Sequence, residues 1–307
     1  MQTLYPSLFR QRHIPPLRRE RLELADGDFL DIDWTTPARG QRILVLHGLE
    51  GSLESHYAGG LLHCLAKAGY TAGLLYFRGR SGTPNRLARS YHSGETGDLE
   101  YIVRRLQKQQ DNSPLSIIGF SLGGNVLLKW LGESGENAGI QQAISISVPF
   151  DLDAAARQLD CGLSRIYRNH LLRKLRLSVI NKAKTHPSPW PPERLHELRS
   201  FREFDNAITA PLHGFRDVDD YYSRASCKQF LTAIRVPTLI LQALDDPFLP
   251  VSALPRPADL APSITLELAD HGGHVGFIEG AVPFKPHFWL EQRILKQLQL
   301  PVDSAHT

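Results

Sequence analysis

The first half of the chain alternates short apolar runs with amphipathic segments. The apolar runs lack polar alternation, which is typical of strands buried on both faces of a parallel sheet. Between them, apolar residues recur at helical spacing. The predicted strands are 42–48, 71–77, 115–120 and 143–148, and the predicted helices are 56–69, 97–109 and 123–133. This order predicts an α/β fold with a mostly parallel, doubly wound sheet.

Two further segments refine this prediction. Residues 21–34 indicate two short strands around a turn at Asp26 and Gly27. After residue 148 the next convincing strand is 238–244, roughly 90 residues later, although loops of α/β units usually have about two to six. A strand at 264–269 and a helix near 286–300 then resume the pattern. We therefore expect a core of residues 1–150 and 232–307, with a helical cap of residues 151–231 inserted after the sixth strand.

Composition and charge exclude several classes of protein. The 307 residues are 42% hydrophobic and 22% charged, as in a globular protein that buries a full core. A net charge of +3 is too small to indicate a nucleic-acid partner by itself. No apolar run approaches the roughly 18–20 residues of a membrane span, and the N-terminal residues lack the apolar region of a signal peptide.

Cysteine usage bears on the compartment and on metal binding. Cys64, Cys161 and Cys227 are odd in number and far apart, which suits a reducing cytoplasm. They form no CxxC or other metal-ligand spacing. His271 and His274 could form half of a metal site, but no third ligand lies at a diagnostic spacing. The sequence therefore predicts a cytoplasmic protein without a metal or other cofactor.

The strongest chemical signal is the G-x-S-x-G of residues 119–123, which places Ser121 after a buried strand and before a helix. This context is that of a nucleophile elbow, a tight and strained turn that exposes the serine hydroxyl above the sheet. Side chains at Gly119 and Gly123 would collide with neighbouring backbone. The competing interpretation is a serine that only caps the helix.

A serine nucleophile needs a base and a carboxylate that orients the base. In this architecture the chain order is serine, carboxylate, histidine. Asp245 and Asp246 follow the strand at 238–244, and His271 and His274 follow the strand at 264–269. We favour Asp246 for its spacing to Pro250, and His274 because two glycines precede it; Asp245 and His271 are the alternatives.

An oxyanion hole needs two backbone amides aimed at the carbonyl oxygen. The first is expected from Leu122, the residue after the nucleophile. The second is expected from the loop at 47–51, where glycines let the backbone turn inward and Leu49 is the expected donor. His47 in this loop could be a second base, but bracing the loop is its expected role.

Ordered motifs along the chain resemble the alpha/beta hydrolase superfamily and its YheT-like branch, alpha/beta hydrolase family four. The similar blocks are LVLHGLEGSLESHY, FRGRSGTPNRLARSYHSGETGDL, GFSLGGNVLLKWLGE, EFDNAITAPLHGF, DYYSRAS, PTLILQALDDPF and HGGHVGF. They span about Arg18 to Lys296. The resemblance implies a Ser121–Asp246–His274 triad and cofactor-free esterase activity on acyl esters. Some relatives carry a membrane anchor, act on lipids or transfer acyl groups.

Together these features predict a serine hydrolase that cleaves carboxylic esters of short to medium acyl chains through an acyl-enzyme. An acyltransferase would differ only in using an alcohol where the hydrolase uses water. The alternative from another class is a non-catalytic binding protein on the same fold, because a fold alone does not establish an activity. Oligomeric state is not evident from the sequence.

Three charged residues of the block at 78–98 lie outside the predicted triad. Arg78 has no derivable part in a triad, so it is expected either to pair with a carboxylate beneath the site or to hold a structural loop. Asp98 and Glu95 are expected to cap the helix that follows.

The insert begins with a basic helical stretch, residues 154–184, whose only acid is Asp160. Its apolar side is expected to lie over Ser121 and to shape an acyl pocket. A cap helix with solvated charges is the simpler interpretation; a lid whose basic face meets an anionic lipid surface is the alternative. The residues assigned to the apolar side are Ile166, Leu171, Leu172, Leu175 and Val179.

Overall fold

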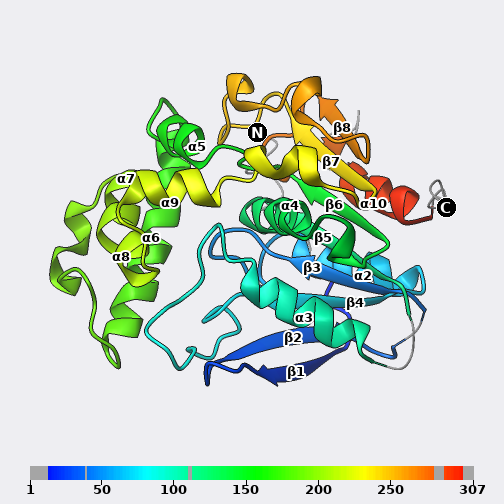
Figure 1. Ribbon diagram of the computed structural model, residues 1–307, viewed down its shortest axis with the longest axis horizontal. Helices are drawn as coiled ribbons and strands as arrows, with labels where there is room; N and C mark the ends of the chain where they lie inside the picture. The colour runs from blue at the N-terminus through cyan, green and yellow to red at the C-terminus, as the bar shows by residue number, and fades with distance from the viewer. Residues whose placement is uncertain (1–12, 39, 110–112, 280–286, 300–307) are drawn as a thin grey trace.

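The computed structural model describes residues 13–38, 40–109, 113–279 and 287–299. Its centre is an eight-stranded sheet of order β1-β2-β4-β3-β5-β6-β7-β8 (Figure 1). The β1–β2 and β2–β4 pairs are antiparallel, and all other pairs are parallel. The strands are β1 Leu17–Glu23, β2 Phe29–Thr35, β3 Arg42–Leu46, β4 Thr71–Tyr76, β5 Leu115–Phe120, β6 Gln142–Ile146, β7 Thr238–Ala243 and β8 Ile264–Ala269.

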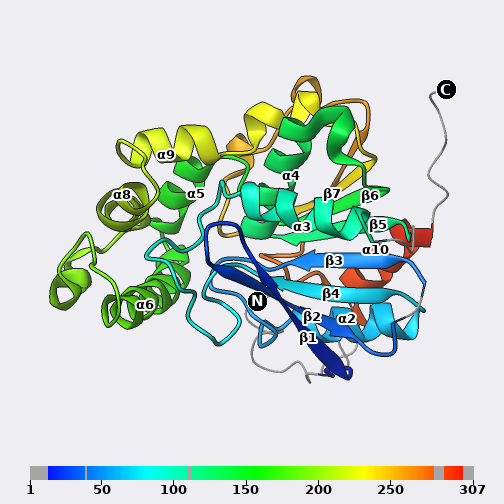
Figure 2. The same cartoon turned by 60° about the horizontal axis from the view of Figure 1, so that its bottom comes forward.

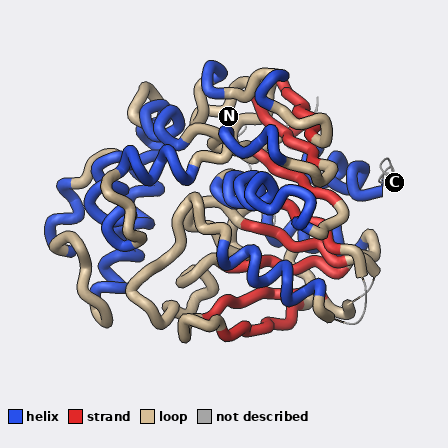
Figure 3. Tube along the Cα trace, viewed as in Figure 1, coloured by secondary structure: helices blue, strands red, loops and turns tan. Residues whose placement is uncertain are grey.

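Helices cover both faces of this sheet, as Figures 1 and 3 show. Their apolar stripes form two clusters with the strands, one containing α3 and α4 and the other containing α2 and α10. A two-stranded ribbon of β9 (Ile278–Glu279) and β10 (His287–Phe288) precedes the last helix. The helices are α2 Ala58–Lys67, α3 Gly97–Gln107, α4 Leu122–Ser134 and α10 Trp289–Gln299.

A separate group of helices lies beyond one end of the sheet (Figure 2). These helices build a third apolar cluster, which Leu49 and Phe248 from loops of the sheet also contact. A single π-helical turn at Asp205–Thr209 joins two of them. The group consists of α5 Leu152–Leu159, α6 Ser164–Ala183, α7 Phe201–Phe204, α8 Ala210–Leu212 and α9 Val218–Ala225.

The predicted fold class is confirmed, because the sheet is mostly parallel and the helical insertion follows the sixth strand, β6. Every predicted strand is present within a few residues of its predicted limits. The helical stretch expected at 154–184 is two helices, α5 and α6, separated at residues 160–163. Residues 1–12, which were expected to hold no signal peptide, lie outside the described residues.

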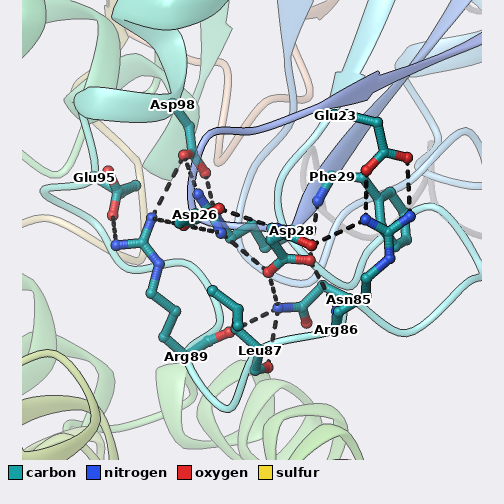
Figure 4. Close-up of polar contacts among 12 residues, drawn as sticks. Glu23, Asp26, Asp28, Phe29, Asn85, Arg86, Leu87, Arg89, Glu95 and Asp98 are labelled. Carbon is teal, nitrogen blue, oxygen red and sulfur yellow. Dashed lines mark hydrogen bonds and ion pairs between the residues drawn. The ribbon is translucent and has the colours of Figure 1, made fainter.

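The buried guanidinium of Arg78, just after β4, binds three carboxylates. Figure 4 labels these carboxylates, which are Asp26, Asp28 and Asp98. Two of its nitrogens donate to Asp98 at 2.7 Å each, and the third donates to Asp26 at 2.8 Å and Asp28 at 3.0 Å. The expected N-cap role of Asp98 is therefore wrong: the N-cap of α3 is Thr96. Because its partners come from the β1–β2 turn and from α3, Arg78 fixes the long loop between β4 and α3.

Among the residues that the structure describes, no helix is both long enough and apolar enough to cross a bilayer.

Candidate active site

Ser121 lies between the last residue of β5 and the first residue of α4. Its φ of 51° and ψ of −116° are strained for a residue with a side chain. The turn is fixed by the Ser121 amide, which donates to the Ile146 carbonyl at 2.8 Å, and by the Ser121 carbonyl, which accepts from Asn125 at 3.0 Å. The side chain is only half-buried, so the hydroxyl can be reached from the cavity beside it.

The flanking glycines are required by close backbone contacts. A Cβ at Gly119 would lie 2.6 Å from the Gly123 carbonyl oxygen. A Cβ at Gly123 would lie 2.6 Å from the His47 carbonyl oxygen and 2.7 Å from that of Leu46. Any larger residue would push α4 away from β3 or β5, so the two glycines of the G-x-S-x-G have the steric role that the sequence predicts.

His274 and Asp246 lie beside this serine although they are far from it in the chain. His274 Nε2 is 2.9 Å from Ser121 Oγ. On the other side of the ring, His274 Nδ1 is 2.9 Å from Asp246 Oδ2 and 3.1 Å from Oδ1. The backbone N–H of Phe248 (2.8 Å) and the side-chain amide of Gln242 (3.1 Å) both donate to Asp246. The carboxylate is therefore held in place while it accepts from the imidazole.

The alternative carboxylate, Asp245, and the alternative histidine, His271, do not join this chain of hydrogen bonds. The His271 side chain is 80% exposed, and its Nδ1 lies 3.7 Å from Asp245 Oδ2. Asp245 uses one oxygen, Oδ1, to accept the amides of Gly272 at 2.8 Å and Gly273 at 2.7 Å. Asp245 thus holds the start of the loop that carries His274. Of the four candidates, His274 contacts Ser121, and Asp246 contacts His274.

Two backbone amides without a protein partner among the described residues belong to residues that line one cavity. Tyrosine hydroxyls accept the amides on both sides of Leu49: Tyr57 accepts from Gly48 at 2.8 Å, and Tyr91 accepts from Glu50 at 2.7 Å. Within the described part of the chain, the amides of Leu49 and Leu122 donate to no protein group. Leu49 and Leu122 both line the cavity that contains Ser121. These two N–H groups are thus available for an oxyanion.

His47 braces this loop. Its Nε2 lies 3.2 Å from the Phe77 amide, which can only donate, so Nε2 is unprotonated. Its Nδ1 then carries the proton and donates to the Gly48 carbonyl at 2.7 Å. Complete burial lowers the pKa of His47 to about 4. With both nitrogens in use, His47 stays neutral at pH 7 and is not placed to act as a second base.

Glu50, the next residue of the loop, connects it to the helix α6. Its buried carboxylate accepts hydrogen bonds from Tyr91 at 2.9 Å, from Arg80 at 2.9 Å and from Ser178 of α6 at 2.7 Å. Arg80 also donates to the Glu50 carbonyl at 2.9 Å. The backbone that presents the Leu49 amide is consequently fixed from both the core and α6.

Backbone strain concentrates in the segments around Ser121 and His274. Non-glycine residues with positive φ lie in the loop after β3, at the elbow, after β6, and just after His274. Among the described residues they are Glu50, Ser121, Ser147, Val275 and Phe277. Such strain persists only where the surroundings enforce it, and it is common at active sites. Ser147 shows one such enforcement, since its hydroxyl accepts the Val275 amide at 3.0 Å.

A cavity of about 180 Å³ lies over Ser121 and His274. Its walls are largely apolar and come mostly from the helices beyond the sheet. One exception is Asp205, where burial raises the carboxyl pKa to about 6. Thr209 at 2.6 Å and Tyr222 at 2.7 Å donate to Asp205, which satisfies this polar group. The apolar wall includes Leu171, Leu175, Val179, Phe201, Phe204 and Ile208.

One of the expected pocket residues lies elsewhere. The prediction that Ile166 shares the inner side of α6 is wrong, because its side chain is 60% exposed, whereas Leu172 is fully buried. At 100° per residue, Ile166 is about 180° from Leu175 around the helix axis. The interior of the cap is therefore formed by the row that includes Leu175 and Val179 and not by Ile166.

No metal centre was found in the parts of the chain that the structure describes: no group of three or more His, Cys, Asp or Glu there could hold an ion. His271 and His274 point to different partners, Asp245 and Asp246.

Sequence reasoning missed two residues that support the histidine. The Phe248 ring stacks on the imidazole of His274, with centroids 3.9 Å apart and planes 6° from parallel. Gln242 contacts Asp246 and, through its carbonyl oxygen, accepts the Val148 amide at 2.9 Å. Gln242 could have been noticed, since it is the one residue with a side-chain amide in the apolar run TLILQAL. Nothing in the local pattern indicates the stacking of Phe248.

Comparisons with known proteins agree with the fold described above. The model of the alpha/beta hydrolase fold family matches residues 41–281. The Escherichia coli (strain K12) protein named "Putative esterase YheT" is 42% identical over 300 residues, covering 96% of this chain and 88% of that protein. The Mus musculus protein named phospholipase ABHD3 is 30% identical, covering 95% of this chain and 74% of its own.

The chain is also similar to a further curated relative and to a solved structure. The Saccharomyces cerevisiae monoacylglycerol lipase is 31% identical to this chain. The similar region covers 77% of this chain and 55% of that protein. The solved esterase Pf2001 of Pyrococcus furiosus has the same fold at 18% identity, with a TM-score of 0.61. The similar region covers 92% of this chain and 90% of the esterase chain. The chain belongs to the alpha/beta hydrolase family, in its YheT-like branch.

Proposed function

We propose that the chain is a serine hydrolase that cleaves carboxylic esters through an acyl-enzyme, with Ser121, His274 and Asp246 as its triad. The observation that carries this proposal is the hydrogen-bonded chain from Ser121 Oγ through both nitrogens of His274 to Asp246, built on a strained elbow. A serine that merely caps a helix needs neither an imidazole at 2.9 Å nor a carboxylate behind it. The ester-hydrolase names of the relatives agree with this function.

In this mechanism Ser121 Oγ attacks the acyl carbon as its proton moves to His274 Nε2. Asp246 holds Nδ1–H, so that Nε2 can accept, and it stabilises the imidazolium that forms. His274 then returns the proton to the leaving alcohol, which departs and leaves the acyl group on Ser121. Water, deprotonated by the same nitrogen, releases the acid. An alcohol in place of water would give acyl transfer by the same steps.

The amides of Leu49 and Leu122 are the proposed oxyanion hole. Neither has a protein partner among the described residues, so neither must break a bond when the carbonyl oxygen becomes charged. Donors that are already oriented cost no reorganisation during the reaction. The Glu50 contacts to Arg80, Tyr91 and Ser178 support this by fixing the residue that follows Leu49.

The cavity supports an apolar acyl group as the substrate. A dry cavity of about 150 Å³ accommodates a benzene molecule, so a cavity of about 180 Å³ suits a short to medium acyl chain. We assign residues 151–231 to a cap whose inner side forms this pocket. The three free cysteines, Cys64, Cys161 and Cys227, fit our assignment of the chain to the cytoplasm.

A series of p-nitrophenyl esters of increasing acyl length tests this function. Hydrolysis is expected to peak at short to medium chains and to fall for long ones. Replacing Leu175 with tryptophan fills part of the cavity, so activity on the best medium-chain ester should fall about tenfold or more while acetate is little affected. The matched control, Leu177→Trp, changes an exposed position of the same helix and should leave the profile unaltered. Absence of hydrolysis for every ester would support the binding protein instead.

A further inference from the structure

The outer side of α6 carries an apolar row exposed to solvent. Leu163, just before the helix, is 80% exposed, and Ile166 and Leu177 are 60% and 52% exposed. Ile180 completes the row at 38%. The spacings of three and eleven residues place all four on one side of a helix. Four of the eight large apolar side chains that are exposed among the described residues thus gather on this helix and its N-cap residue.

The same helix is strongly basic. It contains no Asp or Glu between its first and last residues, although the whole chain has a net charge of only +3. Arg173 and Lys174 are exposed beside Leu177, and within the described residues neither side chain has an ion-pair or hydrogen-bond partner. The Lys and Arg residues of the helix are Arg165, Arg168, Arg173, Lys174, Arg176 and Lys182.

We propose that the outer side of α6, formed by Leu163, Ile166, Leu177 and Ile180 with Arg173 and Lys174, docks on an anionic phospholipid surface. An apolar row flanked by unpaired cations is the pattern of helices that lie in a membrane interface. In Figure 2, α6 lies at the lower left edge of the molecule.

A second copy of the chain fits this surface less well. A twofold dimer would place the same patch of both copies face to face. Arg173 and Lys174 of one copy would then meet the same cations of the other, with no acid on either helix to offset them. Anionic head groups supply the missing negative charge, and the acyl region accommodates the apolar row.

Docking on this side leaves the reaction chemistry untouched but bears on substrate supply. The opposite side of α6 contributes Leu171, Leu175 and Val179 to the cavity over Ser121. A lipid surface against the outer row therefore brings the acyl pocket close to a source of acyl esters. The docking itself does not depend on Ser121 being a nucleophile, so it goes beyond the proposed hydrolysis.

Sedimentation with vesicles tests the proposal. The probes are vesicles of ether-linked phosphatidylcholine with or without about one third phosphatidylglycerol, because ether lipids cannot be hydrolysed and binding is measured apart from catalysis. The full chain is expected to sediment with the anionic vesicles at about 0.1 M salt and to be largely released at about 1 M, where the Debye length falls to about 3 Å. Failure of the wild-type chain to bind anionic vesicles at low salt overturns the proposal.

Paired variants identify the surface. Arg173→Gln with Lys174→Gln should weaken binding about 25-fold, since each cation near an anionic surface contributes roughly fivefold. Ile166→Ser with Leu177→Ser should weaken it by about tenfold or more. The control is Val251→Ser with Leu268→Ser, which removes exposed apolar side chains elsewhere and should bind like wild type. Equal binding by all three variants contradicts the proposal.

Two further measurements keep these outcomes interpretable. Hydrolysis of a soluble p-nitrophenyl ester should be unchanged in the Ile166/Leu177 and Arg173/Lys174 variants, which shows that they are folded. Sedimentation equilibrium without lipid should give a monomer. A dimer that the Ile166/Leu177 change disrupts would mean that a second copy covers the apolar row, and it would overturn lipid docking.

Discussion

Replacing Ser121 with alanine is expected to lower ester hydrolysis by a factor of about 10⁴ or more. Loss of a serine nucleophile removes the acyl-enzyme route and leaves only what the oxyanion donors and binding can supply. The fold should persist, because within the described residues the hydroxyl makes one side-chain hydrogen bond, the one to His274. Steady-state kinetics with a p-nitrophenyl ester and a thermal melt of the same sample measure both effects.

Comparing the loss of turnover with the change in melting temperature separates a catalytic role of Ser121 from a structural one. Alanine keeps the Cβ and the strained backbone of Ser121, so the melting temperature should shift by no more than a few degrees. Turnover near the wild-type value in a folded Ser121→Ala protein would show that the elbow is not the nucleophile.

The second large effect is expected at Asp246. Changing it to asparagine should reduce kcat about 10³- to 10⁴-fold. The 2.8 Å bond from the Phe248 amide favours oxygen at the Oδ1 position, which leaves the new NH₂ group at Oδ2, the atom 2.9 Å from His274 Nδ1. That NH₂ donates to Nδ1 and drives the proton to Nε2, where it blocks acceptance from Ser121.

Asp245 provides the matched control for this change. Its Oδ1 alone accepts the amides of Gly272 and Gly273, and the carbonyl oxygen of an asparagine can do the same. Asp245→Asn should therefore lower kcat by less than about tenfold. If Asp245→Asn were the more damaging of the two, the assignment of Asp246 to the triad would be wrong.

The features predicted best from the sequence depend on short stretches of chain. The strands that end before Ser121, Asp246 and His274 are unbroken apolar runs, and the carboxyl ends of parallel strands meet at one edge of a sheet. Chain order then narrows the partners of the serine, and the glycines before His274 indicate a loop that can turn back. The fold class was predictable for the same reason.

The role of Asp98 shows where local patterns fail. An acid in the first turn of a helix normally suggests a cap, and the sequence offers nothing against that interpretation. Its carboxylate instead turns toward Arg78, which also binds Asp26 and Asp28 of the N-terminal hairpin. That choice depends on how a distant hairpin packs against the loop, which no local pattern encodes.

The error at Ile166 has a different origin. The helix α6 has apolar residues on two sides, one facing the cavity and one facing solvent. A helix of this kind gives no single apolar direction, so its sequence alone does not indicate which side faces inward. Counting 100° per residue would have separated Ile166 from Leu175, but choosing the inner side needed the tertiary structure.

The most direct test of the central claim is the site at which a fluorophosphonate reacts. The intact chain is incubated with the reagent, digested and mapped by mass spectrometry, beside Ser121→Ala and Asp246→Asn. We predict one adduct, on Ser121, formed rapidly in the wild-type chain, slowly in Asp246→Asn and not at all in Ser121→Ala. An adduct on another residue, or ester hydrolysis that continues without any adduct, would contradict the account.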